Sequence, residues 1–195
     1  GGGRAVVVGG GGGGRVTVAE VTQLTLDPVM DTYYFMDTMV SKMPAMIEQM
    51  GITRARGTGL LTKKEISQQQ RVELASILSQ MESTLRAQNT NLEKVMRYAP
   101  ALKDRLSVPT TDFSAGAEKI FALVRDDIFT EKFATAPQDY FAMTTQVIDL
   151  GYKVMFETLI PQFERQLQER LDRSRNVLAF EIGLAVAVGL LVAYL

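Results

Sequence analysis

The stretch from Leu26 to Leu61 constrains the fold more than any other part of the sequence. Its apolar residues recur with alternating steps of four and three, which places them on one face of a helix. The residues of this face, which we call the seam, are Val29, Tyr33, Met36, Val40, Met43, Ile47 and Met50. Because a period near 3.5 lets helices pack along their length, the pattern predicts a helical bundle or a coiled coil.

The same count continued past Met50 assigns Arg54, Gly57 and Leu61 to the seam. A guanidinium group stays charged in proteins, so it is costly at a position that the pattern reserves for apolar side chains. Arg54 is therefore the first candidate for a ligand-binding residue. Two alternatives stay open, namely an ion pair with a carboxylate across a dimer seam and extension of the charged group to water.

Composition removes most catalytic chemistry. The chain of 195 residues has no Cys, His or Trp, which excludes thiol nucleophiles, Ser-His-Asp triads and the usual zinc, copper and haem ligands. No pair of carboxylates lies on an apolar face, so we expect no enzyme activity, no metal and no cofactor. With 21 Lys and Arg against 22 Asp and Glu, the net charge of -1 gives no sign of a nucleic-acid partner.

Residues 1–25 form a glycine-rich segment of low complexity. One interpretation is a phosphate-binding loop, which would need a helix opening on the glycines and a further strand. Neither is visible downstream, so we favour a flexible or artefactual leader. Because the chain starts with Gly and stops inside an apolar run, we interpret it as part of a longer protein.

The rest of the chain predicts an all-α fold, an antiparallel four-helix bundle spanning residues 26–176. The first helix opens at Asp27 and Pro28, a good N-cap followed by a residue that needs no donor. Pro44 should bend the first helix, and Pro161 should kink the fourth or shift its register. The polar Gln88 on the apolar face of the second helix should fix packing register. The other residues of that face are Leu74, Leu78, Met81, Leu85, Leu92 and Val95. The expected helices cover residues 28–61, 65–97, 112–135 and from 137 onward, with a break at 62–64 and a connection at 98–111 that is not helical throughout.

Residues 177–195 are apolar except for Glu181. A run of this length approaches the roughly 20 residues that span a bilayer, so it predicts a truncated transmembrane helix; the alternative is a buried core helix. No helix breaker separates it from the helix before it. A helix shared by the bundle and the membrane would carry a displacement from one to the other.

The stretch LDPVMDTYYFMDTMVSKMPAMIEQMGITRARG, together with TTQVID at 144–149 and the C-terminal apolar helix, resembles the extracytoplasmic four-helix-bundle sensor domains of bacterial methyl-accepting chemotaxis receptors. The resemblance implies a homodimer formed through the first helix, anchored in the bacterial inner membrane with a periplasmic sensor domain. Related modules precede histidine kinases and GGDEF diguanylate cyclases, so the output stays open.

If the helix pairs turn near Lys63 and Thr135, residues at the depth of Arg54 converge near the membrane-distal end. Arginine offers paired donors to a carboxylate, which predicts a small anionic solute as the ligand. The alternative is a helical bundle that binds a protein partner and no small ligand. The candidate ligand-binding residues are Arg54, Arg71, Arg125, Tyr140, Thr144 and Thr145.

Overall fold

The structure, a computed structural model of the chain, describes residues 32–194, and every regular element among them is a helix. The predicted all-α class is therefore confirmed. The glycine-rich leader at 1–25 and the helix start at Asp27 lie outside the described residues.

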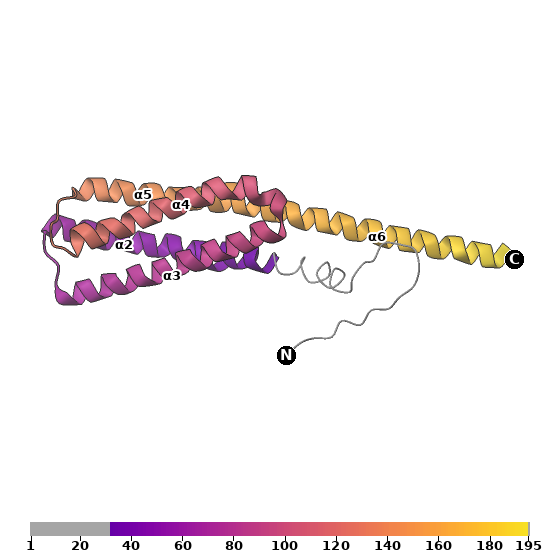
Figure 1. Cartoon of the computed structure of the whole chain (residues 1–195), viewed down its shortest axis with the longest axis horizontal. Coiled ribbons are helices and arrows are strands. Elements are labelled where there is room, and N and C mark those ends of the chain that lie inside the picture. The colour runs from indigo at the N-terminus through magenta and orange to yellow at the C-terminus, as the bar shows by residue number, and fades with distance from the viewer. Residues whose placement is uncertain (1–31, 195) are drawn as a thin grey trace, which may run out of the picture.

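Four helices lie side by side along their length (Figure 1). They are α2 (Met43–Lys63), α3 (Gln68–Tyr98), α4 (Lys103–Leu123) and α5 (Pro137–Lys153). Helix α2 packs chiefly against α5 and also against α3, while α4 packs against α3 and α5. The α2–α3 and α4–α5 connections lie at the same end of the molecule, which we call the loop end (residues 64–67 and 129–136). Helix α6 (Ile160–Tyr194) continues from α5 and extends past the other helices at the opposite end.

The apolar face predicted for α3 is the face that the structure buries. The buried residues on it are Leu74, Leu78, Met81, Leu85, Leu92 and Val95. Gln88 lies on the same face and is fully buried, as expected for a residue inside the core. Neither polar atom of its side chain has a hydrogen-bond partner among the described residues. An unsatisfied buried amide costs roughly 1–3 kcal/mol, so Gln88 lowers the stability of this core.

The predicted seam holds from Met43 onward and is wrong before it. Met43, Ile47 and Met50 are buried, but Tyr33 and Val40 are 62% and 71% exposed. The cause is a π-helical turn, η1 (Thr38–Lys42), between the two parts. One extra residue in a turn rotates the following side chains by about 100° relative to the preceding ones. The chain therefore presents two faces where the sequence pattern predicts one.

The two π turns that precede a proline lie at the same height along the helices. Turn η1 ends two residues before Pro44, and η4 (Val154–Leu159) ends two residues before Pro161. Proline lacks an N–H group and clashes with the carbonyl four residues earlier, and a wider turn relieves that clash. The register shift predicted at Pro161 is thus confirmed.

Two contacts between the same chain segments show that the π turns lie at the same height. The rings of Phe35 and Phe163 lie 5.6 Å apart on one side of the π turns. On the other side, Ile47 lies so close to Gly151 that an added Cβ would be 3.0 Å from its side chain. Since the two chain segments run in opposite directions between these contacts, η1 and η4 face each other across one helix pair.

Helix boundaries show where local signals decide. The break predicted at 62–64 is present but begins two residues later: α2 continues through Lys63, and Lys64, left-handed with φ 53°, opens the break. Helix α3 then opens with a capping box in which Ser67 and Gln70 bond each other's backbone N–H.

The expectation that residues 98–111 are not helical throughout is only partly right. Ala99 is non-helical, but a short 3-10 turn, η2 (Pro100–Leu102), leads directly into α4, and Pro109 lies inside that helix. Buried Leu106 and Phe113 continue the core face through the proline. Pro109 has no N–H group to donate to the carbonyl of Arg105, so the helix lacks one backbone hydrogen bond there.

The connection from α4 to α5 is held by one carboxylate. It follows a further π turn, η3 (Val124–Ile128), and Asp127 in that turn accepts the backbone N–H groups of Ala134 and Thr135 at 2.7 and 2.8 Å. Burial raises the pKa of Asp127, but the hydrogen bonds from Thr135 and Ala134 outweigh it and leave the pKa below its ordinary value. These bonds offset the cost of left-handed Glu131 and Phe133, with φ 58° and 46°.

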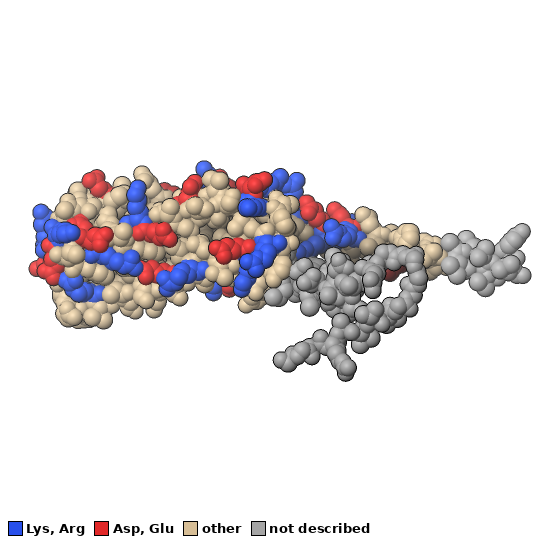
Figure 2. Space-filling model, in the orientation of Figure 1, with Lys and Arg blue, Asp and Glu red and all other residues tan. Residues whose placement is uncertain are grey.

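Within the described residues, no helix has both the length and the apolar character needed to cross a membrane. The span expected at 177–195 reaches past the described side chains, which end at Val186, and stays a prediction. Figure 2 shows charges of both signs interspersed over the packed helices and the start of the free length of α6, followed by a stretch of α6 with few charges.

Candidate functional site

Arg54 lies on α2 and reaches across to α5. Its guanidinium donates a hydrogen bond of 2.8 Å to the hydroxyl oxygen of Thr145. The same group stacks over the ring of Phe141, 4.6 Å from the ring centre, which is a cation–π distance. Thr145 in turn donates to the carbonyl of Phe141 at 2.8 Å. Together, Thr145 and Phe141 hold the guanidinium at the boundary between the two helices.

A groove of about 380 Å³ runs along the same helix pair, with Arg54 among its walls. Gly51 contributes no side chain to it, and a Cβ added there would meet nothing within 4 Å. Such a volume is typical of a site for a small ligand. The residues that line the groove are Pro44, Ile47, Glu48, Gly51, Arg54, Ile148, Tyr152 and Met155.

Arg54 is the main candidate in this groove because no carboxylate of residues 32–194 forms an ion pair with it. A guanidinium has five N–H donors, and Thr145 accepts one of them. The partly buried side chain therefore combines a full positive charge with donors that remain for a ligand. Glu48 lies on the same wall, so the groove is not uniformly positive.

Tyr140 and Thr144 lie beneath this surface, fully buried between α2 and α5. The Tyr140 hydroxyl donates to the backbone carbonyl of Thr53 at 3.1 Å, and burial raises the pKa of Tyr140. The Thr144 hydroxyl donates to the carbonyl of Tyr140 at 2.8 Å. An added Cβ at Gly57 would lie 2.5 Å from the Tyr140 ring, so only glycine permits this close approach. Both residues thus support the helix pair from inside.

Arg71 and Arg125 have partners on other elements. Arg71, on α3, donates to the carbonyl of Phe129 and pairs with Glu131 in the α4–α5 connection. Arg125, in η3, pairs with Glu82 on α3. The structure therefore brings Arg54 together with Thr145 but not with the other two arginines. Participation of the six candidates in ligand binding stays a prediction.

The sequence reasoning missed Phe141, Glu48 and Tyr152. Phe141 precedes Thr145 by one helical turn and so shares its face, a signal that was present in the sequence. Tyr152 stacks on Phe156 at 6.2 Å on the exposed surface. Its place in the groove depends on how α5 packs against α2, which no local pattern reveals. Within the described residues, no cluster of acidic residues is arranged to hold a metal ion.

Comparisons of the chain with protein-family models, with curated proteins and with solved structures give no match.

Proposed function

We propose that this chain is the extracytoplasmic ligand-sensing part of a bacterial transmembrane chemoreceptor. In this proposal, residues 26–176 form an antiparallel four-helix bundle, and 177–195 form the membrane helix. The observation that carries the proposal is the Arg54 guanidinium, held by Thr145 and Phe141 beside a groove and without a carboxylate partner among residues 32–194. A small carboxylate bound there would complete the pairing of the charge.

Binding in this groove would act on the helices that form it. The groove has walls from α2 and α5, and the chain stays helical from Pro137 through η4 to Tyr194. A ligand that prefers one relative position of α2 and α5 shifts the population toward that position. The continuous helix would pass the displacement to the membrane, and from there to a cytoplasmic output.

The exposed apolar residues of α6 support the membrane part of the proposal. Their side chains face solvent over more than half of their area, an arrangement that is unfavourable in water and favourable in lipid. These residues are Val177, Leu178, Phe180, Ile182, Leu184 and Val186.

The face that η1 turns outward supports a homodimer through the first helix. Tyr33, Met36 and Val40 are exposed there at helical spacing, which leaves an apolar strip available to a second copy. The same strip favours the second candidate function, a bundle that binds a protein partner and no small solute. A third reading keeps the sensor but places it before a histidine kinase or a diguanylate cyclase.

The test is a thermal-shift titration of the full chain with acetate, succinate, glycine and inorganic phosphate. A solute that binds only the native state raises the melting temperature by mass action. We expect at least one of these anions or zwitterions to do so, and Arg54→Ala to abolish the rise while leaving the helical content unchanged. Arg86→Ala removes an exposed arginine of α3 outside the groove and is expected to keep the full rise.

Two results would count against the proposal. A rise with succinate, glycine or inorganic phosphate that persists in Arg54→Ala would place the ligand elsewhere. No rise with any of the four solutes would favour the partner-binding bundle.

A further inference from the structure

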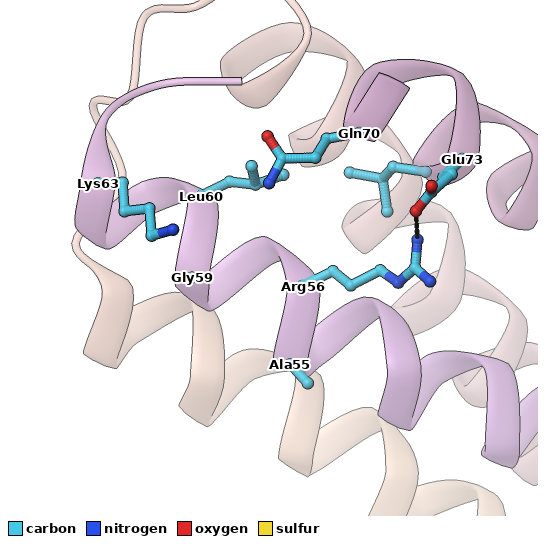
Figure 3. Close-up of a pocket in the computed structure, with 8 residues that line it drawn as sticks. Ala55, Arg56, Gly59, Leu60, Lys63, Gln70 and Glu73 are labelled. Atoms are coloured by element: carbon cyan, nitrogen blue, oxygen red, sulfur yellow. Dashed lines mark hydrogen bonds and ion pairs between the residues drawn. The ribbon is translucent and has the colours of Figure 1, made fainter. Parts of the chain in front are cut away.

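A second cavity, separate from the groove at Arg54, opens at the loop end between the end of α2 and the start of α3 (Figure 3). Its volume is about 280 Å³, near the lower limit for small-molecule sites, so it suits only a small ligand. It shares no lining residue with the groove. The lining residues are Ala55, Arg56, Gly59, Leu60, Lys63, Gln70, Glu73 and Leu74.

The orientation of one donor in this cavity is fixed by the helix cap. The side-chain oxygen of Gln70 accepts the backbone N–H of Ser67 at 2.9 Å, and the backbone N–H of Gln70 bonds the Ser67 hydroxyl at 3.1 Å. This reciprocal pair leaves the amide NH₂ group of Gln70 on the other side. In Figure 3 that nitrogen and the ammonium of Lys63 both point into the space between the helices.

Lys63 supplies the unpaired charge. No carboxylate among residues 32–194 forms an ion pair with it. The other cation of the cavity, Arg56, is neutralised by Glu73 at 2.7 Å. A hydrogen bond from Gln69, and a weaker effect of the one from Arg56, keep the pKa of Glu73 below its ordinary value. This carboxylate is therefore ionised at neutral pH. The end of the cavity at Lys63 is therefore positive, and at the other end the charges of Arg56 and Glu73 neutralise each other.

The space between these ends is apolar and open. Leu60 and Leu74 form its floor, where each is almost fully buried in the core (4% and 1% exposed) and presents only a small part of its side chain, and Ala55 takes up little room. A Cβ added at Gly59 would meet nothing within 4 Å. This part of the cavity accepts a short hydrocarbon chain, and Glu73 at the far end repels a second negative group.

From this arrangement we infer a second binding site, for a short-chain monocarboxylate. Lys63 and the amide of Gln70 bind the carboxylate, and the hydrocarbon tail lies on Leu60 and Leu74. Both donors are exposed, so water competes with the ligand and the expected dissociation constant is roughly millimolar. The site goes beyond the proposed receptor function and does not depend on Arg54.

The experiment is a titration of the full chain in detergent with sodium butyrate, followed by NMR of the alanine and leucine methyl groups. We expect the signals of Ala55, Leu60 and Leu74 to shift with saturation, more tightly for butyrate than for acetate or inorganic phosphate. Butylamine, which has a similar tail and the opposite charge, should give no saturable shift. If butylamine or phosphate matched butyrate, or if no shift occurred at tens of millimolar (roughly ten times the expected constant), the site would be disproved.

Matched variants separate this site from the groove. Lys63→Met keeps most of the side-chain stem and should weaken butyrate binding about tenfold, while Lys64→Met, one residue outside the lining, should not. Gly59→Leu should fill the cavity and abolish binding, while Gly51→Leu, at an equally open glycine in the groove, should leave it unchanged.

Arg54→Ala should also leave butyrate binding in this cavity intact. The cavity can therefore be established even if the sensor proposal fails, and the reverse also holds. Equal binding in Lys63→Met and the unaltered chain, or undiminished binding in Gly59→Leu, would overturn the inference.

Discussion

Individual side chains in this protein stabilise the connections between helices as well as the core. Asp127 shows this most clearly, because its two oxygens bond the backbone of Ala134 and Thr135 across a segment that contains two left-handed residues. Hydrogen bonds to a charged acceptor contribute about 1.5–3 kcal/mol each, more than those between neutral groups. The loop end therefore depends strongly on the ionised form of one residue.

We expect Asp127→Asn to lower the free energy of unfolding at pH 7 by about 1–3 kcal/mol, because the amide keeps one neutral acceptor oxygen and replaces the other with an NH₂ group that cannot accept the second backbone N–H. The native-state pKa of Asp127 lies below its unfolded value of about 3.9, so its stabilisation is complete above that pH and is lost as the pH falls through the native-state pKa. Urea unfolding at pH 7 and at about pH 3 should show the difference between Asp127→Asn and the unaltered chain shrinking in acid.

Asp126→Asn is the control. Asp126 is the preceding residue in the chain, its side chain is exposed, and its carboxylate bonds no backbone group of the connection. An equal loss in both variants would show that charge alone, and not the bonds to the connection, is responsible. The same would follow if the loss in Asp127→Asn did not depend on pH.

Among the helices, the π turns determine which faces are buried. Turns η1 and η4 each end just before a proline and face each other between the Phe35–Phe163 and Ile47–Gly151 contacts. A π turn holds one residue more than an α turn, so its conversion moves the following helix by about 1.5 Å and rotates it by about 100°. In the proposed receptor, η4 supplies Met155 to the binding groove and leads into the membrane helix.

We expect Pro161→Ala to let η4 become α-helical, because alanine restores the N–H group and removes the ring clash. The rotation should carry Phe163 away from Phe35, whose ring lies 5.6 Å from it. NMR contacts between the two rings should then weaken or vanish. Pro109→Ala is the control. Pro109 lies in α4, which continues through it without a π turn, so this variant should leave the ring contacts unchanged. Retained ring contacts in Pro161→Ala would show that packing, not proline, maintains η4.

At the scale of the whole molecule, the packed helices leave two apolar regions exposed. One is the free length of α6, and the other is the strip at Tyr33, Met36 and Val40. Scattered apolar residues on a surface are normal, but a strip at helical spacing is typical of a surface that pairs with another helix. The proposed homodimer would cover this strip.

We expect Val40→Glu to reduce self-association of the full chain in detergent, because a dimer would bury the new charge without a partner. Sedimentation equilibrium should show a dimer for the unaltered chain and a dissociation constant raised at least about tenfold for the variant, equivalent to about 1.4 kcal/mol. Val108→Glu makes the same change at a similarly exposed position on α4 and should have no effect. Equal effects of the two variants, or a monomeric unaltered chain, would contradict the proposed interface.

The sequence by itself determined the all-α class, the presence of a break after α2, the buried face of α3 and the helix start at Pro137. Each of these depends on residues within a few turns of one another, because periodicity, caps and proline act locally. The depth at which Arg54 and Thr145 lie could also be anticipated, since the α2–α3 and α4–α5 connections set how far each residue is from the same end of the molecule, whereas the packing of α2 against α5 could not.

Tertiary structure decided the rest. The outward turn of Tyr33 and Val40, the helical course of α4 through Pro109 and the separate partners of Arg71 and Arg125 all follow from packing between distant segments. Local preferences differ by about 1 kcal/mol for ordinary residues, and up to about 3 kcal/mol for proline, whereas burial of a large apolar side chain contributes about 1.5–3 kcal/mol. Several such side chains together therefore outweigh the pattern wherever the two disagree.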